Sequence, residues 1–205
     1  MVEKNFIDGT FHFSKIDPAY QDIFKAAIPY LETRQNLIHT FIVYQYAGLL
    51  LRHEPGAPEI ILPAIILHDV GWSAIPEPDQ LKAFKPGMRD ETLRRKHEIE
   101  GVVIAEGILT TLDCSETRVH KITSIIDGHD TTYGARSPED AVVKDADKLW
   151  RYSKVGFGID IERFDFLPRR HFDYLVKSID RWFLTPSGRA TAIDEIKKRE
   201  LDYGL

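Results

Sequence analysis

The sequence predicts an all-α protein, and three observations lead to this prediction. Apolar residues recur at helical spacing in almost every segment of the 205-residue chain. Residues that cap helices or suit their first turn precede several of these segments. Alternation with a period of two, which is typical of a half-buried strand, appears only weakly, near Phe11-His12-Phe13. We therefore expect a single-domain helical bundle.

The first helices are predicted from their caps and apolar faces. Asp17 is a capping residue, and Pro18 after it suits a first helical position. Helical spacing then runs from Arg34 to Leu51. Pro58 opens a short segment that is apolar on every side, as buried helices are.

Two residues limit the helix that follows Pro58. Pro63 lies inside it, and because an interior proline costs about 3 kcal/mol, we expect a kink or a late helix start there. Gly71 is expected to stop the helix. Three prolines and a glycine in residues 73–88 predict a loop, inserted beside the site discussed below.

The rest of the chain predicts five more helices. They run from about Asp90 to Leu112, from Ser115, from Ser137-Pro138 through the DADKLW segment, from Leu167 to Leu184, and from Arg189 to Leu201. We expect residues 1–33 to form an N-terminal segment and helix on the core, residues 34–155 to carry the functional site, and residues 156–205 to form closing helices.

Composition excludes several classes of protein. Hydrophobic residues are 43% and charged residues 29%, as in ordinary globular proteins, and the net charge of −5 indicates no nucleic-acid footprint. Cys114 is the single cysteine, so the chain has no intrachain disulfide and no thiolate metal cluster. The N-terminus does not resemble a signal peptide, and the most apolar stretch, Ile60 to Leu67, is too short to span a bilayer. We expect a cytoplasmic protein that does not bind membranes.

Several ionisable residues lie on apolar helix faces and are predicted to point toward one core from five helices. They are His39, His68, Asp69, His97, His129 and Asp147. Burying such groups unpaired costs several kcal/mol each, and far more for an ionised aspartate, whereas a cation among them removes this cost. Imidazole and carboxylate ligands without thiolate favour Zn, Mn, Fe, Co or Ni.

Each residue taken alone also has a simpler interpretation. A lone histidine on an apolar face is usually a hydrogen-bonded core residue, and His68-Asp69 could be a charge pair at a helix end. Asp147 could pair with Arg151 one turn later. The joint occurrence of all six favours a site. The other histidines, with polar neighbours, are predicted to be unrelated to it: His12, His53, His120 and His171.

The order of these residues carries a resemblance. His39 is followed by HDVG with His68-Asp69, KHEIEG with His97, GHD with His129, and DADKL with Asp147. Over about residues 35 to 155 this order resembles the HD-domain metal-dependent phosphohydrolase superfamily. The resemblance implies a helical core that binds one or two divalent transition-metal ions.

The resemblance also implies a ligand set. His39, His68, Asp69 and Asp147 would hold a first metal, with Asp147 rather than Asp145 as the last ligand. In two-metal members, the residues matching His97 and His129 bind a second metal, which the HD aspartate bridges. This sequence departs from many such members, which carry a double histidine where it has His129-Asp130. In single-metal members the same histidines contact substrate phosphate or water.

The expected activity is hydrolysis of a phosphoester or phosphoanhydride by a metal-activated water, with Asp69 orienting that water. Lys148 and Arg151 flank Asp147 and would bind the phosphate of a small substrate, a nucleotide among the candidates. Two alternatives stay open. Some HD proteins with six such ligands are di-iron oxygenases, and others are non-catalytic nucleotide-binding modules. The sequence identifies neither the substrate nor the oligomeric state.

Overall fold

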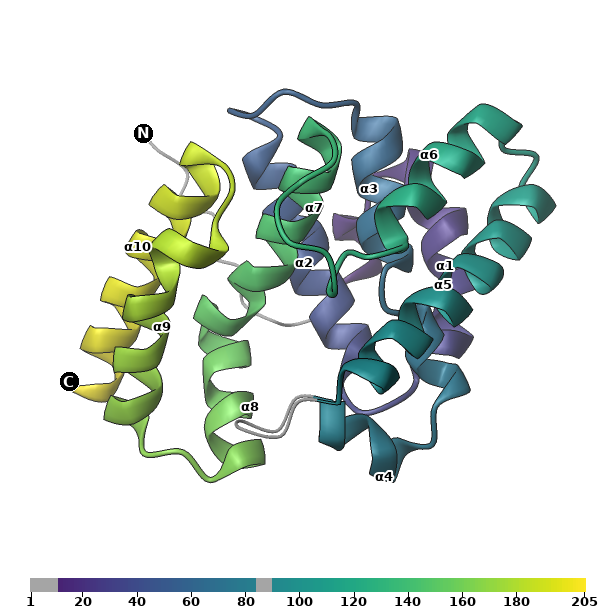
Figure 1. The fold of residues 1–205 in the computed structure, drawn as a ribbon. Helices are drawn as coiled ribbons and strands as arrows, with labels where there is room; N and C mark the ends of the chain where they lie inside the picture. Colours follow the sequence, from purple (N-terminus) through teal and green to yellow (C-terminus); the bar gives the residue numbers. More distant parts are fainter. Residues whose placement is uncertain (1–10, 84–89) are drawn as a thin grey trace.

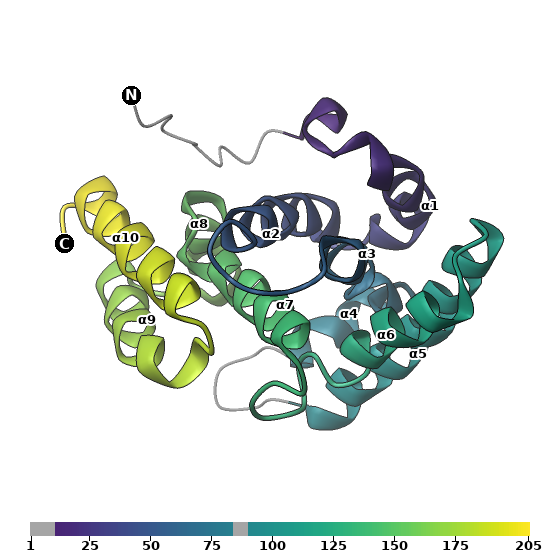
Figure 2. The ribbon, with the colours of Figure 1, turned by 90° about the horizontal axis from the view of Figure 1, so that it is seen from above.

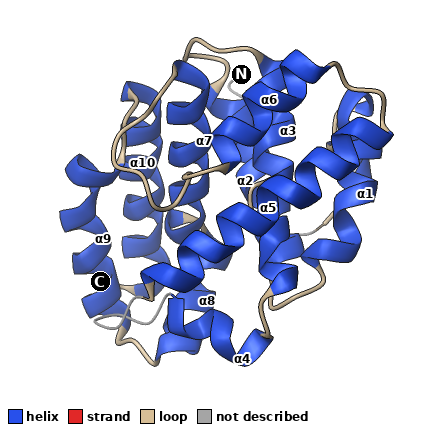
Figure 3. Ribbon diagram, turned by 45° about the vertical axis from the view of Figure 1, so that its right-hand side comes forward, coloured by secondary structure: helices blue, strands red, loops and turns tan. Residues whose placement is uncertain are grey.

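The computed structural model describes residues 11–83 and 90–205. These residues form ten α-helices and five short 3-10 helices, and they contain no strand (Figure 3). The α-helices are α1 (Gln21–Leu31), α2 (Asn36–Leu50), α3 (Pro58–Leu67), α4 (Glu77–Gln80), α5 (Glu91–Thr111), α6 (Glu116–Ile126), α7 (Pro138–Leu149), α8 (Lys154–Phe164), α9 (Pro168–Trp182) and α10 (Pro186–Tyr203). The 3-10 helices are η1 (Phe13–Lys15), η2 (Pro18–Tyr20), η3 (Val70–Ala74), η4 (Leu81–Ala83) and η5 (Trp150–Tyr152). The all-α prediction is confirmed.

Helices α2, α3 and α7 form the centre of the molecule and pack against one another (Figures 1 and 2). On one side of this centre, α5 packs on α6, and α6 packs on α3. On the opposite side, α9 and α10 lie next to each other, and α10 contacts α7 (Figure 2). The buried apolar cluster includes residues from both sides, from Phe24 of α1 to Ile196 of α10. One continuous core therefore joins the central helices to the C-terminal pair.

Helix α3 begins at Pro58 and continues through Pro63, so the alternative of a late start is wrong. Pro63 lacks the N–H that would bond the carbonyl of Glu59 one turn earlier. That carbonyl instead accepts a hydrogen bond, 3.1 Å long, from the guanidinium of Arg118 in α6. All eight residues from Ile60 to Leu67 are buried, which explains why the segment is apolar on every side.

Gly71 does not end α3 as predicted, because the helix ends at Leu67 and Gly71 lies within η3, where its φ is not positive. Its role is close packing. A Cβ at this position would overlap the carbonyl oxygen of His97 and the backbone nitrogen of Gly101, both in α5. The absence of a side chain lets η3 approach α5 closely and places the end of α3 beside that helix.

The prediction of a loop over residues 73–88 is wrong for its first part, because α4 and η4 form there. Gln80 ties this segment to the core: its buried amide donates to the carbonyls of Trp72 and Ile75 and to the hydroxyl of Thr33. The remainder of the predicted loop, residues 84–88, lies outside the described residues.

Helix α8 was not predicted, because Gly156 and Gly158 weaken its intrinsic helix propensity. The Ser153 side chain caps it, with Oγ accepting from the Gly156 N–H at 3.0 Å. Gly156 is also required there, since a Cβ would overlap the carbonyl of Trp150. Several other helices start close to their predicted caps; the Asp90 carboxylate, for example, accepts from two N–H groups in the first turn of α5.

Among the described residues, none of the helices taken singly has the length and apolar composition needed to cross a membrane. The pair Pro58–Ala74 and Glu77–Ala83 meets those two criteria only jointly, and it is bent by 116°.

Candidate metal centre

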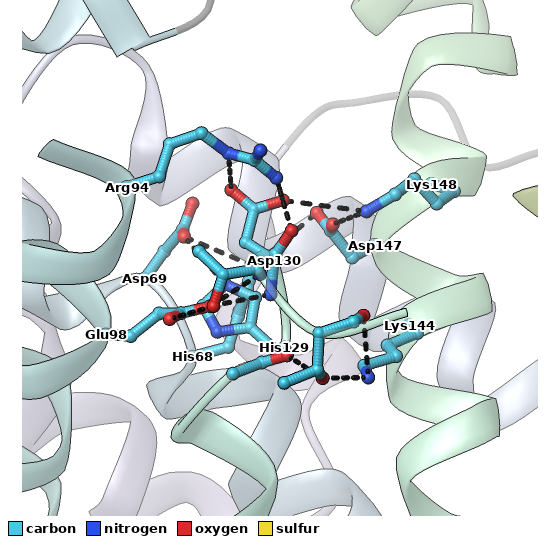
Figure 4. Close-up of polar contacts among 12 residues, drawn as sticks. His68, Asp69, Arg94, Glu98, His129, Asp130, Lys144, Asp147 and Lys148 are labelled. Carbon is cyan, nitrogen blue, oxygen red and sulfur yellow. Dashed lines mark hydrogen bonds and ion pairs between the residues drawn. The ribbon is translucent and has the colours of Figure 1, made fainter. Parts of the chain in front are cut away.

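Five segments bring histidine and aspartate side chains together at the centre of the molecule. His39 comes from α2, His68 and Asp69 from the turn between α3 and η3, His97 from α5, His129 from the turn after α6, and Asp147 from α7. Figure 4 shows four of them converging from α3, the α6–α7 connection and α7. The structure thus brings together all six residues that the sequence analysis singled out.

The Asp69 carboxylate lies among four imidazoles. Its Oδ1 is 3.7 Å from Nε2 of His68, 3.8 Å from Nε2 of His97 and 3.6 Å from Nε2 of His129. Its Oδ2 is 3.5 Å from Nε2 of His39. The indole N–H of Trp72 donates to Oδ1 at 3.1 Å and so orients the carboxylate. A carboxylate in this position can reach ions on both sides of it.

Two groups of ligating atoms flank Asp69. On one side, Nε2 of His39 and Nε2 of His68 are 3.1 Å apart, and Asp147 Oδ1 lies 3.4 and 3.6 Å from them. On the other side, Nε2 of His97 and Nε2 of His129 are 3.3 Å apart. Each side has donor atoms close enough together to hold one ion.

Backbone carbonyls fix the orientation of two imidazoles. Nδ1 of His68 is 2.8 Å from the carbonyl oxygen of Ile65, and Nδ1 of His129 is 2.9 Å from that of Ile126. A carbonyl only accepts, so each Nδ1 carries a proton and each Nε2 points toward the centre. Burial opposes protonation of Nε2, but the nearby carboxylates, Asp69 first among them, raise the pKa of His68 and raise that of His129 to about 9. A bound metal would replace that proton on Nε2 and leave Nδ1 protonated. This is the tautomer that a metal requires, held by the outer hydrogen bond that metal-ligating histidines commonly make.

The electrostatics of the cluster also suit a cation. Burial opposes ionisation of Asp69, but the nearby His68 and His129 hold the pKa of Asp69 well below its usual range. Burial likewise opposes ionisation of Asp147, yet Lys148, His39 and His68 keep the pKa of Asp147 well below its usual range. The carboxylates are therefore ionised. Burial and the neighbouring His129 lower the pKa of His97 to about 4, so its imidazole is neutral near pH 7.

This donor set fits a divalent transition metal. Nε2 of His68 lies 3.1 Å from Nε2 of His39, and both residues are buried. A cation between them would satisfy both nitrogens and the adjacent carboxylates. Four imidazoles and two carboxylates without thiolate match the ions expected from the sequence, and the two-sided arrangement has donors for one or two of them.

Asp130 stands where many two-metal members carry a second histidine, and it pairs with two cations. Its carboxylate lies 3.0 Å from the guanidinium of Arg94 and 3.7 Å from Nζ of Lys148 (Figure 4). Burial opposes its ionisation, but Lys148 and Arg94 hold the pKa of Asp130 far below its usual range. Asp130 could also serve as a third donor beside His97 and His129.

Glu98 holds the turn that carries His129. It is fully buried, and its carboxylate accepts from the N–H groups of Asp130 and Thr131, at 2.9 and 2.8 Å, and from the Thr131 hydroxyl at 2.6 Å. Arg95 pairs with the same carboxylate at 2.9 Å. Burial opposes ionisation of Glu98, but His129 and these hydrogen bonds lower its pKa.

The cluster opens into a pocket of about 120 Å³. Its lining includes Asp69, His39, His129 and Asp147, both predicted phosphate-binding residues, Lys148 and Arg151, and three arginines that the sequence analysis did not identify, Arg34, Arg94 and Arg163. Both predicted residues already contact carboxylates. Lys148 Nζ is 3.0 Å from Asp147, and Arg151 donates to Asp160 at 2.5 Å.

Arg94 could have been identified from the sequence, because it precedes His97 by three residues and so lies on the same face of α5. Arg34 lies just before α2, and Arg163 lies on the unpredicted α8, so no spacing relates them to the cluster. Asp145, the other aspartate of DADKL, points elsewhere: its buried carboxylate accepts from the N–H groups of Leu184 and Thr185.

The prediction that His171 lies among polar neighbours is wrong. It is buried, stacks on Phe166 and contacts Phe157, and its Nε2 is 3.8 Å from the Asp160 carboxylate. His12, His53 and His120 are exposed and do not line the pocket.

A family model described as HD domain matches residues 36–151, more than half of the chain. All six residues of the cluster fall inside the matched range. Comparison with curated proteins and with solved structures gives no significant match.

Proposed function

This chain belongs to the HD-domain superfamily of metal-dependent phosphohydrolases, and we propose that it hydrolyses a nucleotide or another small phosphoester or phosphoanhydride. The observation that carries the proposal is the junction of two features in one pocket. Six buried or partly buried histidine and aspartate residues, called here the metal cluster, form the group that could hold metal, and five cationic side chains line the space beside it. Phosphoryl transfer to water needs chiefly positioned charge and an activated water, and this pocket offers groups for both.

The proposed ligands divide between two positions. His39, His68 and Asp147 would hold one ion, and His97 and His129 a second, with Asp69 shared between them. A divalent metal bound there lowers the pKa of water toward 7 and stabilises charge on phosphoryl oxygens.

The chain's own residues would position the reactants. Asp69, fixed by the indole N–H of Trp72, would accept a hydrogen bond from the attacking water and orient it. Lys148 and Arg151 would bind anionic oxygens of the phosphorylated substrate by charge-assisted hydrogen bonds. Asp160 would orient Arg151, since it accepts from that guanidinium at 2.5 Å.

A di-iron oxygenase is the second candidate, and the position of Asp69 favours it as well. A carboxylate within 3.5 to 3.8 Å of four imidazoles suits a bridge between two ions, which both chemistries use. The cationic lining favours the hydrolase, because it matches a phosphorylated substrate. A purely binding module, the third candidate, has no need of all six ligating groups.

The test combines metal analysis with one assay run in two atmospheres. Purified protein should contain at least one transition-metal ion per chain, and His68→Ala or Asp69→Ala should lose it, because each removes a donor from the cluster. His53→Ala, at an exposed histidine, is the matched control and should retain the metal. Wild-type protein loaded with Mn should release phosphate, pyrophosphate or a nucleotide from a phosphorylated panel equally well with and without dioxygen.

Three outcomes would contradict the proposal. Turnover only with Fe and dioxygen would identify the oxygenase. Tight nucleotide binding without turnover under any condition would identify the binding module. If the protein holds no metal and stays inactive after addition of Mn, Fe, Co, Ni or Zn, the cluster is not a metal centre.

A further inference from the structure

The pocket has a second cationic region, apart from Arg94 and Lys148 beside Asp130. It consists of Arg34, Arg151 and Arg163, called here the arginine end. These residues come from the connection before α2, from η5 and from α8. Their charges are close enough to interact: the pKa of Arg34 falls to about 10, chiefly through burial and also through the nearby Arg163 and Arg151, against the opposing effects of Asp69 and Glu77. Three arginines from separate segments thus line one pocket, close enough together for their charges to interact.

The arginine end is held in place before any ligand binds. Arg34 has a left-handed backbone, with φ of 49°, which costs free energy in a residue that is not glycine. Its guanidinium lies 4.9 Å from the Trp72 ring and donates to Asn36 at 3.2 Å. Arg163 reaches from α8 to the side chain of Gln35, 3.5 Å away. A strained backbone at the edge of a pocket is a common mark of a binding site.

The charges lining the pocket do not balance once metal is present. Five cationic residues and four carboxylates line it, which leaves one net positive charge with the histidines neutral. Each divalent ion at Asp69 and Asp147 adds two more. Metal also neutralises the carboxylates of Asp69 and Asp147, which otherwise act on Arg34 and Arg151 respectively. Of the acidic residues lining the pocket, Asp160 then remains beside the arginine end, because Asp130 pairs with Arg94 and Lys148. Glu77, outside the lining, also acts on the charge of Arg34.

The pocket is also small. Its volume of about 120 Å³ is well below the roughly 300–1,000 Å³ of sites that enclose drug-sized ligands. A compact ligand with several negative charges fits this combination of size and charge better than a large ligand with one phosphate.

We propose that the substrate is a compact molecule with two anionic groups, and that Arg34, Arg151 and Arg163 bind the group that does not react. The first group is the phosphoryl group at the metal cluster, so this inference rests on the proposed function. The second is a phosphate or a carboxylate, both of which accept the paired N–H groups of a guanidinium. The arginine end then acts in recognition and positions the reacting phosphoryl group.

The test measures binding and needs no turnover. Isothermal titration of Mn-loaded protein would compare methylenediphosphonate and phosphonoacetate, which have two anionic groups, with methylphosphonate, which has one. Metal content is measured before and after, because these compounds can chelate free Mn. We expect at least one of the two-group compounds to bind at least about tenfold more tightly than methylphosphonate.

Variants then assign the preference to the arginine end. Arg163→Gln should weaken binding of that two-group compound about tenfold. It should change the affinity for methylphosphonate by no more than about twofold, because the one-group compound occupies the metal cluster. Arg163→Lys should recover part of the loss, since it keeps the charge without the paired donors. Arg169→Gln, at an exposed arginine that pairs with Asp173 in α9, is the matched control and should change nothing.

Equal binding of all three compounds would overturn the proposal, as would an equal effect of Arg163→Gln and Arg169→Gln. Because the readout is binding, its failure can be told apart from failure of the proposed function. A protein that hydrolyses phosphoesters but shows no preference for two anionic groups disproves only the arginine end. A protein that prefers two groups but releases no phosphate disproves only the hydrolase.

Discussion

The metal cluster and the arginine end face the same pocket but are held in place by different means. Backbone carbonyls of Ile65 and Ile126 orient His68 and His129, each three residues earlier in the same turn of chain. At the arginine end, side chains orient the cations: Asp160 holds Arg151, and Gln35 contacts Arg163. Side-chain supports change with single substitutions, whereas backbone supports persist. This fold can therefore keep its chemistry constant while its recognition varies.

The largest effect should come from moving the backbone that carries the cluster. Gly71→Ala would place a Cβ against the backbone of α5 at His97 and Gly101, where no flexible side chain can yield. We expect a loss of stability at or above the about 3 kcal/mol of severe overpacking, together with loss of metal binding. Urea unfolding and elemental analysis would measure both.

The matched control is another glycine of the same region. A Cβ at Gly107, in α5, would meet nothing within 4 Å, so Gly107→Ala should stabilise the protein by roughly 0.5–1 kcal/mol through helix propensity. If Gly71→Ala proves as harmless as Gly107→Ala, close backbone packing does not position the metal cluster.

A smaller effect is expected from changing Glu98, a side chain that supports the cluster from behind. Glu98→Ala leaves the buried N–H groups of Asp130 and Thr131 without their acceptor, which should cost about 1–3 kcal/mol. The turn that carries His129 would also shift, and we expect metal affinity to fall about 10–100-fold, as for other outer supports of ligands. Chemical unfolding and competition with a chelator would measure the two effects.

Glu106→Ala, at an exposed position of α5, is the control and should change neither quantity. Unchanged metal affinity in Glu98→Ala would mean that the backbone alone holds His129. That result would mean that the cluster, unlike the arginine end, needs no support from this side chain. A large loss of metal affinity would show that the cluster also depends on a side chain.

The smallest effect is a pH dependence located behind the arginine end. Burial lowers the pKa of His171 to about 4, with Asp160 opposing the shift. Because the unfolded chain takes up this proton near pH 6.5, the native state is fully stable above that pH. Stability is lost as the pH falls from 6.5 toward 4. At pH 5 we expect a loss of about 1–2 kcal/mol relative to pH 8 from this residue.

His171→Phe removes the titrating group and should suit the aromatic contacts with Phe157 and Phe166. The difference in unfolding free energy between pH 8 and pH 5 should therefore be smaller in this variant than in the wild type. His120→Gln, at an exposed histidine, should leave that difference unchanged. Identical pH profiles for His171→Phe and the wild type would show that His171 does not titrate in this range.

Much of the metal cluster could be read from the sequence because its residues obey helical spacing. His39 and His97 lie on apolar faces of α2 and α5, and the apolar run of α3 ends at His68. A buried ionisable group on such a face is costly, so several of them together indicate a shared cation before any distance is known. The same local signals placed most helix starts, since caps such as Asp90 act within one turn of chain.

Only the tertiary structure decided the rest, because those features depend on contacts between segments distant in the chain. Helix α8 forms despite its glycines, since Gly156 must pack against Trp150. Arg163 meets Gln35 across 128 residues of sequence. Gly71 was predicted to end a helix, but its lack of a side chain instead lets η3 pack closely against α5. A sequence pattern records what a residue does to its own turn of helix, and these residues act on other segments.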